Sequence, residues 1–146
     1  MEITLVPIGQ VASPVKEKIA HGWEKVESRI ILDPELTESL EGIEEFSHIV
    51  VLFWMHQSHG APPVKVHPQR REDLPLVGVF STRSPHRPNS IGLSTVRLLK
   101  RENNTLYVKG LDAIDATPVL DIKPHLPFDK ISDERFPEWI SKLRQK

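Results

Sequence analysis

The densest group of chemistry-bearing residues lies between positions 78 and 94, which read GVFSTRSPHRPNSIGLS. Apolar residues at both ends of this segment are typical of strands, and the polar hook between them contains two prolines that restrict its backbone. Arg83 and Arg87 offer planar forks for a carboxylate or phosphate, and Asn89 could cap a turn or bind an amide edge. The alternative is an arginine-rich turn whose side chains bond neighbouring carbonyl groups.

A second group of polar residues follows between positions 111 and 124. Asp115 precedes a turn predicted at Thr117-Pro118, and Asp121 and Lys123 share one face if they belong to a strand. A carboxylate beside an ammonium could bind a ribose diol or accept a proton. The same spacing also fits a surface ion pair of little energetic value.

The histidines do not form a recognisable metal motif. Prolines at positions 62 and 63 argue against the helix that an HExxH pairing needs, and no carboxylate accompanies the histidines. We therefore expect no metal site. The serines near His86 lack a GxSxG elbow, so a nucleophilic serine is also disfavoured. The histidines in question are His56, His59, His67 and His86.

Charge is distributed unevenly along the 146 residues, although 19 basic and 20 acidic side chains nearly cancel. Residues 1–50 carry ten acidic and four basic residues, whereas residues 65–101 carry eight basic and two acidic ones. The basic segment is a candidate for binding an anionic partner, with Lys65, Arg70 and Arg71 as possible phosphate contacts. A solvated face opposite an acidic part of the same chain is the alternative.

Composition excludes several other functions. The seven glycines are never closer than thirteen positions, so neither a GxGxxG nor a GxxxxGK phosphate loop exists. Cysteine is absent, which excludes thiolate metal sites and thiol nucleophiles. The uncharged residues 49–64 contain histidines and prolines, and we expect neither a membrane span nor a signal peptide. The sequence thus predicts one cytoplasmic domain over residues 1–146.

Short apolar runs separated by turn signals predict a mainly β fold. Asn103 and Asn104 tolerate positive φ and predict a hairpin turn between the runs Ile91–Leu99 and Thr105–Leu111. Helical patterns are limited to a short helix after Asp33 and one over about residues 134–144. Because a long open sheet edge would promote aggregation, we expect a closed or nearly closed antiparallel β-barrel over about residues 3–128. The predicted strands are Ile3–Ile8, Val26–Leu32, His48–Met55, Leu76–Phe80, Ile91–Leu99, Thr105–Leu111 and Val119–Ile122.

Five motifs in order resemble the TsaA-like, or TrmO, family of S-adenosylmethionine-dependent tRNA methyltransferases. They are Pro7-Ile8-Gly9 with Ser13-Pro14, then Phe46-Ser47-His48, His67-Pro68, the hook, and the segment from Asp115 to Pro124. The resemblance covers about residues 3–128. It implies a β-barrel enzyme that works as a homodimer, with its cofactor near the subunit interface. It also implies methyl transfer to N6 of N6-threonylcarbamoyladenosine, beside the anticodon in tRNA.

The resemblance further implies roles for individual residues. S-adenosylmethionine would contact His56, Gln57, Arg83, Leu93, Asp115, Ala116, Thr117 and Pro118. A ureido nitrogen is a poor nucleophile, so a base should help to remove its proton. Asp121 is our candidate for that catalytic role, with Lys123 or Arg87 binding the threonyl carboxylate. We assign Arg87, Asn89, Lys65, Arg70 and Arg71 to tRNA. A methyltransferase acting on another substrate and a noncatalytic ligand- or RNA-binding barrel remain the alternatives.

The chain departs from the family pattern at four places. Family members usually have Pro at the position of Ser90, Gly at Ala116 and Tyr at His125. A Pro-Arg-Gln element corresponds to residues 22–24, which are Gly-Trp-Glu here. The last difference removes an arginine expected near the cofactor, so we assign no cofactor contact to residues 22–24.

Overall fold

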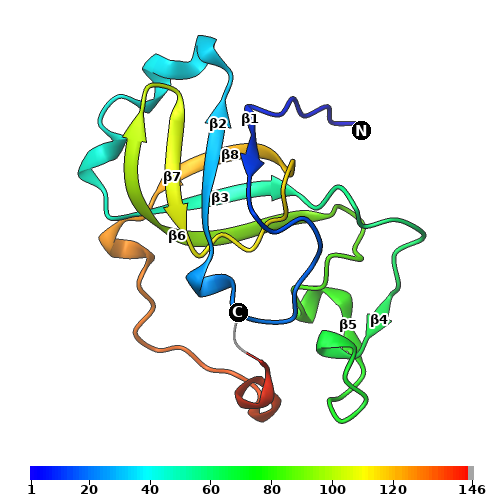
Figure 1. The fold of residues 1–146 in the computed structure, drawn as a ribbon. Coiled ribbons are helices and arrows are strands. Elements are labelled where there is room, and N and C mark those ends of the chain that lie inside the picture. The colour runs from blue at the N-terminus through cyan, green and yellow to red at the C-terminus, as the bar shows by residue number, and fades with distance from the viewer. Residues whose placement is uncertain (145–146) are drawn as a thin grey trace.

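Six strands close into an antiparallel barrel in the computed structural model, which describes residues 1–144 (Figure 1). The order around the barrel is β1–β2–β7–β6–β3–β8, and β8 pairs with β1. Closure gives every barrel strand two neighbours, and the predicted closed, mainly β fold is confirmed. The strands are β1 (Gly9–Ala12), β2 (Glu27–Leu32), β3 (His48–Trp54), β6 (Ile91–Glu102), β7 (Thr105–Lys109) and β8 (Pro118–Pro124).

Alternating side chains of these strands fill the barrel. On β3, Ile49, Val51 and Phe53 are buried, whereas Val50 and Leu52 between them point outward. Buried positions of the other strands, such as Ile30, Leu106 and Val119, complete the same core. Three outward residues of β3, Val50, Leu52 and Trp54, are nevertheless apolar, which distinguishes this side of the barrel from an ordinary solvated face.

Between β3 and β6 the chain leaves the barrel as residues 55–90, which we call the excursion. Its ends meet where the Met55 N–H donates to the Ser90 carbonyl at 2.8 Å. The excursion contains the small sheet of β4 (Lys65–Val66) and β5 (Val77–Gly78). It also contains the 3₁₀ helices η4 (Pro68–Arg70) and η5 (Val79–Ser81). In Figure 1 it projects below and to the right of the barrel.

The predicted β6–β7 hairpin is present. Leu106 pairs with Arg101 and Thr105 with Glu102, so Asn103 and Asn104 form the turn between the strands. Asn103 has a φ of 52°, the left-handed conformation that asparagine tolerates. The Asn104 side-chain amide also donates to the Leu32 carbonyl at 2.6 Å, which ties the hairpin to the end of β2.

The first predicted strand was wrong, and the fourth was too long. None of Ile3–Ile8 belongs to β1, which begins at Gly9, and residues 1–7 are exposed. Ile8 still bonds to both neighbours, since its N–H donates to the Val119 carbonyl at 2.8 Å and its carbonyl accepts the Asp33 N–H at 2.9 Å. After Asp33, Pro34 starts a 3₁₀ helix in place of β2. In the segment predicted as a strand over 76–80, only Val77–Gly78 pairs, and the chain then turns into η5.

The helical segments within residues 1–144 are short 3₁₀ helices. The helix predicted after Asp33 forms η2, but the one predicted over 134–144 shrinks to η7. Pro137 precedes η7 and disfavours helical backbone at the residue before it. None of the helices described here has the length and apolar character that crossing a bilayer requires. The helices outside the excursion are η1 (Trp23–Lys25), η2 (Pro34–Leu40), η3 (Ile43–Glu45), η6 (Pro127–Asp129) and η7 (Glu138–Lys142).

Candidate functional site

Strand pairing brings three separate segments to one end of the barrel, which we call the rim. Trp54 at the end of β3 pairs with Ile91 at the start of β6, and Phe53 pairs with Val119 at the start of β8. The residues that follow β3 and those that precede β6 and β8 are therefore neighbours in space. The predicted cofactor residues at the rim are His56, Gln57, Leu93, Asp115, Ala116, Thr117 and Pro118.

His56 carries an unsatisfied polar atom at the rim. Its side chain is half-buried, and its Nδ1 is buried without a hydrogen-bond partner among residues 1–144. An unpaired buried nitrogen destabilises the folded chain unless a partner arrives from outside. Gln57 beside it is exposed. The rim therefore offers a ready hydrogen-bonding position for a polar ligand.

The turn from Asp115 to Pro118 is held by internal bonds. The Asp115 carboxylate accepts the Ser13 N–H at 2.9 Å and the Lys16 ammonium at 2.8 Å. The Lys16 contact, followed by the Ser13 amide, holds the pKa of Asp115 below its usual value. Thr117 is buried, and its hydroxyl donates to the Ile114 carbonyl at 2.7 Å. Asp115 thus fastens the rim to the loop after β1.

Ala116 stands where the resemblance described above implies Gly. Its φ is 67°, and its side chain is exposed. A left-handed alanine is strained because its Cβ crowds the backbone, whereas glycine is not. The backbone conformation of this turn therefore explains the glycine of the family pattern, and this chain keeps the conformation without it.

In the hook, Arg87 points back at its own backbone. One terminal nitrogen donates to the carbonyls of Thr82 and Ser84, at 3.0 and 3.2 Å. The alternative interpretation of an arginine bonded to neighbouring carbonyls therefore describes part of what Arg87 does. Arg83 is exposed, and so is Asn89. The Ser90 hydroxyl donates to the Pro85 carbonyl at 2.8 Å, a bond that the Pro implied here by the resemblance would lack.

Asp121 and Lys123 share the outer face of β8, as their spacing predicts. Their carboxylate and ammonium are 2.9 Å apart, and the Ile122 N–H donates to the same carboxylate. Asp121 pairs with Leu52 on β3, which pairs in turn with Leu93 on β6. Asp121 therefore lies in the same outward row as Leu93, about 10 Å away at the usual strand spacing.

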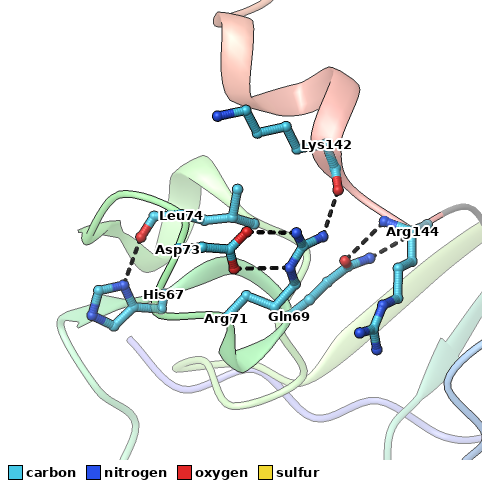
Figure 2. A network of polar contacts seen from close by, with 7 residues as sticks. All are labelled: His67, Gln69, Arg71, Asp73, Leu74, Lys142 and Arg144. Atoms are coloured by element: carbon cyan, nitrogen blue, oxygen red, sulfur yellow. Dashed lines mark hydrogen bonds and ion pairs between the residues drawn. The ribbon is translucent and has the colours of Figure 1, made fainter.

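The three basic residues assigned to tRNA have different surroundings. Lys65 and Arg70 are exposed, and an Arg70 terminal nitrogen lies 3.3 Å from His86 Nε2. Arg71 forms two bonds to Asp73 and a third to the Lys142 carbonyl, as Figure 2 shows. Next to it, the Gln69 side chain donates to the Arg144 carbonyl and accepts the Arg144 N–H. Arg71 therefore connects the excursion to the C-terminal segment.

Lys18 lies near Arg70, a proximity that sequence reasoning missed. Partial desolvation, and then the nearby charge of Arg70, lower the pKa of the exposed Lys18 below the usual lysine value. Together with the Arg70–His86 contact, this brings basic groups of the β1–β2 loop, η4 and the hook into one region. Lys18 lies outside the basic segment in the sequence, so charge counting gave no signal for it.

A pocket adjoins the candidate site. An open pocket of about 470 Å³ lies against the outside of β2 and β7, with Lys16, Arg29, Tyr107 and Asp115 in its lining. Asp115 is the predicted cofactor residue that it includes, so this pocket adjoins the rim at the Asp115 turn.

Within residues 1–144, no three histidine or acidic side chains are grouped so as to hold a metal ion.

Comparisons with known proteins bear on this site. Residues 11–130 match the family described as the tRNA-methyltransferase O N-terminal domain. A probable S-adenosyl-L-methionine-binding protein of Pyrococcus abyssi is 40% identical over 142 residues, covering 93% of this chain and 75% of that protein. A mouse tRNA (adenine(37)-N6)-methyltransferase is 50% identical over 103 residues, covering 70% of this chain and 23% of the enzyme.

The crystal structure of TrmO from Pseudomonas aeruginosa has the same fold, with a TM-score of 0.77 and 38% sequence identity. The match covers 92% of this chain and 61% of that structure. This chain therefore spans less than two thirds of the solved structure and about a quarter of the mouse enzyme.

Proposed function

The chain belongs to the TrmO family, and from that membership we propose that it is an S-adenosylmethionine-dependent methyltransferase acting on adenine N6 in tRNA. The substrate that we propose is N6-threonylcarbamoyladenosine beside the anticodon, in the cytoplasm. The observation that carries the proposal is the meeting of His56, Leu93 and the Asp115 turn at one rim, although they come from three distant parts of the sequence.

The residues at the rim fit S-adenosylmethionine. The buried, unpaired His56 Nδ1 needs a polar partner, and Leu93 presents an exposed apolar side chain. Outside the rim, Arg83 in the hook is exposed, and its guanidinium suits a carboxylate. In this assignment Gln57 and the Asp115–Pro118 turn complete the contacts. The bound cofactor supplies an electrophilic methyl group, so the protein mainly has to hold the acceptor nitrogen in line with it.

Asp121 is the proposed acceptor of the N6 proton. It lies on the outward row that contains Leu93, and Lys123 holds its carboxylate in position. Asp121→Asn keeps the shape but removes the base, so we expect kcat to fall about a hundredfold or more with unchanged cofactor affinity. Equal losses in kcat and cofactor affinity would instead identify the Asp121–Lys123 pair as structural.

Arg83 and Arg87 should separate cofactor binding from tRNA use. Arg83→Ala should weaken cofactor affinity about ten- to a hundredfold, because one charged hydrogen-bonding partner is lost. Arg87→Ala should mainly impair binding of tRNA. Isothermal titration with the cofactor and a gel-shift assay with tRNA measure the two effects. If both variants lose only thermal stability, the hook is scaffolding.

We propose a homodimer that covers the apolar outer face of β3 and β6. The exposed or half-buried residues of this face are Val50, Leu52, Trp54, Ile91 and Leu93. A continuous apolar face beside a proposed site suggests an interface, and a second copy there would place the cofactor near it. Sedimentation should give a dimer mass for the native chain and a monomer for Ile91→Glu. A native monomer at every concentration contradicts this assignment.

The proposed reaction is tested with labelled S-adenosylmethionine and tRNA, followed by mass spectrometry of the nucleosides. We expect the N6-methylated form of threonylcarbamoyladenosine. A different methylated nucleoside would retain the methyltransferase and change its substrate. If the chain binds S-adenosylmethionine but transfers no methyl group, the result would favour a noncatalytic binding barrel.

A further inference from the structure

Phe80 presents its ring to solvent at the start of the hook. Its side chain is 76% exposed, whereas the preceding residue, Val79, is buried. Single exposed apolar residues are common on protein surfaces, so exposure alone carries no functional meaning. The surroundings of this ring are what require an explanation.

The ring is held in place by a chain of contacts. The Val79 N–H donates to the Val64 carbonyl at 3.0 Å, and both the N–H and the hydroxyl of Thr82 donate to the Val79 carbonyl. Arg87, fixed by its bonds to the Thr82 and Ser84 carbonyls, places its guanidinium carbon 5.8 Å from the centre of the Phe80 ring. Phe80 and Arg87 therefore form a preorganised pair, which we call the platform.

The platform lies beside basic groups. Arg83 is three positions from Phe80, and the Arg70–His86 contact joins η4 to the same hook. Because an arginine nitrogen only donates, His86 Nε2 accepts in this contact, and no carboxylate takes part in it. An aromatic face next to several cations is the combination with which proteins bind unstacked bases and their phosphates.

We propose that Phe80 stacks against an unpaired base of the RNA substrate, with Arg87 beneath the ring and the Arg70–His86 region facing the phosphate backbone. This inference rests on the proposed function and assigns to Phe80 the contact with an unpaired base of that substrate. Stacking on an aromatic ring is insensitive to base identity, so Phe80 supplies affinity and position while the rim selects the reacting adenine.

The test compares four replacements by fluorescence anisotropy with a labelled anticodon stem-loop. Phe80→Ala should weaken RNA binding about tenfold or more, because a stacked base is lost. Phe80→Leu should be nearly as weak, since it keeps an apolar side chain without an aromatic face, whereas Phe80→Trp should bind at least as well as Phe. Phe128→Ala is the matched control, because Phe128 is 79% exposed but lies in η6, beyond the opposite end of β3.

Cofactor affinity and methyl transfer are measured on the same preparations. Unchanged cofactor affinity with weakened RNA binding in Phe80→Ala supports the platform. If the native chain methylates tRNA and Phe80→Ala binds RNA normally, the platform is wrong and the proposed function stands. If the native chain binds no RNA, both fail. Conversion of a native dimer to a monomer by Phe80→Ala would also overturn the platform, because the ring would then belong to a subunit interface.

Discussion

Gly92 faces into the barrel on β6, directly opposite Phe53 on β3. A Cβ built on Gly92 would overlap three carbon atoms of the Phe53 ring. Phe53 is itself 3% exposed and surrounded by the core, so its ring has little space into which it could move. We therefore predict that Gly92→Ala destabilises the fold, although alanine is ordinarily the better residue in a strand.

The expected magnitude follows from two opposing effects. Forcing an extra methyl group into a packed core costs about 1–3 kcal/mol. Replacing glycine restricts the unfolded chain and returns about 0.4–1 kcal/mol. At the middle of each range, the net loss is about 1.3 kcal/mol. With an unfolding entropy of about 2.1 cal/mol/K per residue, this lowers the Tm of a 146-residue chain by about 4 °C.

Calorimetric unfolding without ligand measures this shift. Gly78→Ala is the matched control, since nothing lies within 4 Å of a Cβ at Gly78 and its φ of −58° suits alanine. Its Tm should be unchanged or slightly higher. Adding Phe53→Leu to Gly92→Ala should cost less than the two single effects together, because the smaller side chain removes the overlap. A Gly92→Ala protein at least as stable as the native chain would refute the reasoning.

Three further predictions concern the rim and the excursion. The Lys16 ammonium and an amide N–H depress the pKa of Asp115, so its contribution to stability is present above about pH 4 and is lost as the pH falls through the folded-state pKa. In urea unfolding, Asp115→Asn should therefore lower the free energy of unfolding more at pH 7 than at pH 3. An equal loss at both pH values would contradict this. Ala116→Gly relieves a left-handed alanine and should raise the free energy of unfolding by about 0.5–1 kcal/mol, measured by the same titration. Arg70→Ala should lower the salt dependence of tRNA binding by about one phosphate contact. Arg71→Ala loses the bond to the C-terminal segment and should mainly lower the stability of the fold. A lower salt dependence in Arg71→Ala, with Arg70→Ala unchanged, would show that Arg71 contacts RNA.

The strands could be predicted wherever local signals decide the structure. Val and Ile runs, the Asn103–Asn104 turn and the period-two spacing of Asp121 and Lys123 depend on neighbours in sequence, and each has its expected conformation or contact. Local signals failed where a distant partner decides. Ile3 has the composition of a strand residue, yet ladder pairing starts only at Gly9, where β2 on one side gives way to the 3₁₀ helix that begins at Pro34.

Contacts between distant segments explain what the sequence could not reveal about the site. Lys18 lies near Arg70 only because the β1–β2 loop approaches the excursion. Arg71 was expected to bind phosphate, and nothing in its own neighbourhood of the sequence indicates that the Lys142 carbonyl would accept from it. His56 was assigned through family resemblance, whereas the buried, unpaired state of its Nδ1 depends on the packing of the whole rim.

Closure of the barrel between its first and last strands also has a kinetic consequence. Gly9 pairs with Val119, about 110 positions later, whereas β6 and β7 are joined by a tight turn. Hairpins form in about 1–10 μs, but folds dominated by such distant pairings take milliseconds to seconds. The β6–β7 hairpin should therefore appear early and the β1–β8 seam late. Since the Asp115 turn is fastened across that seam, a nascent chain acquires the rim only after β8 has left the ribosome.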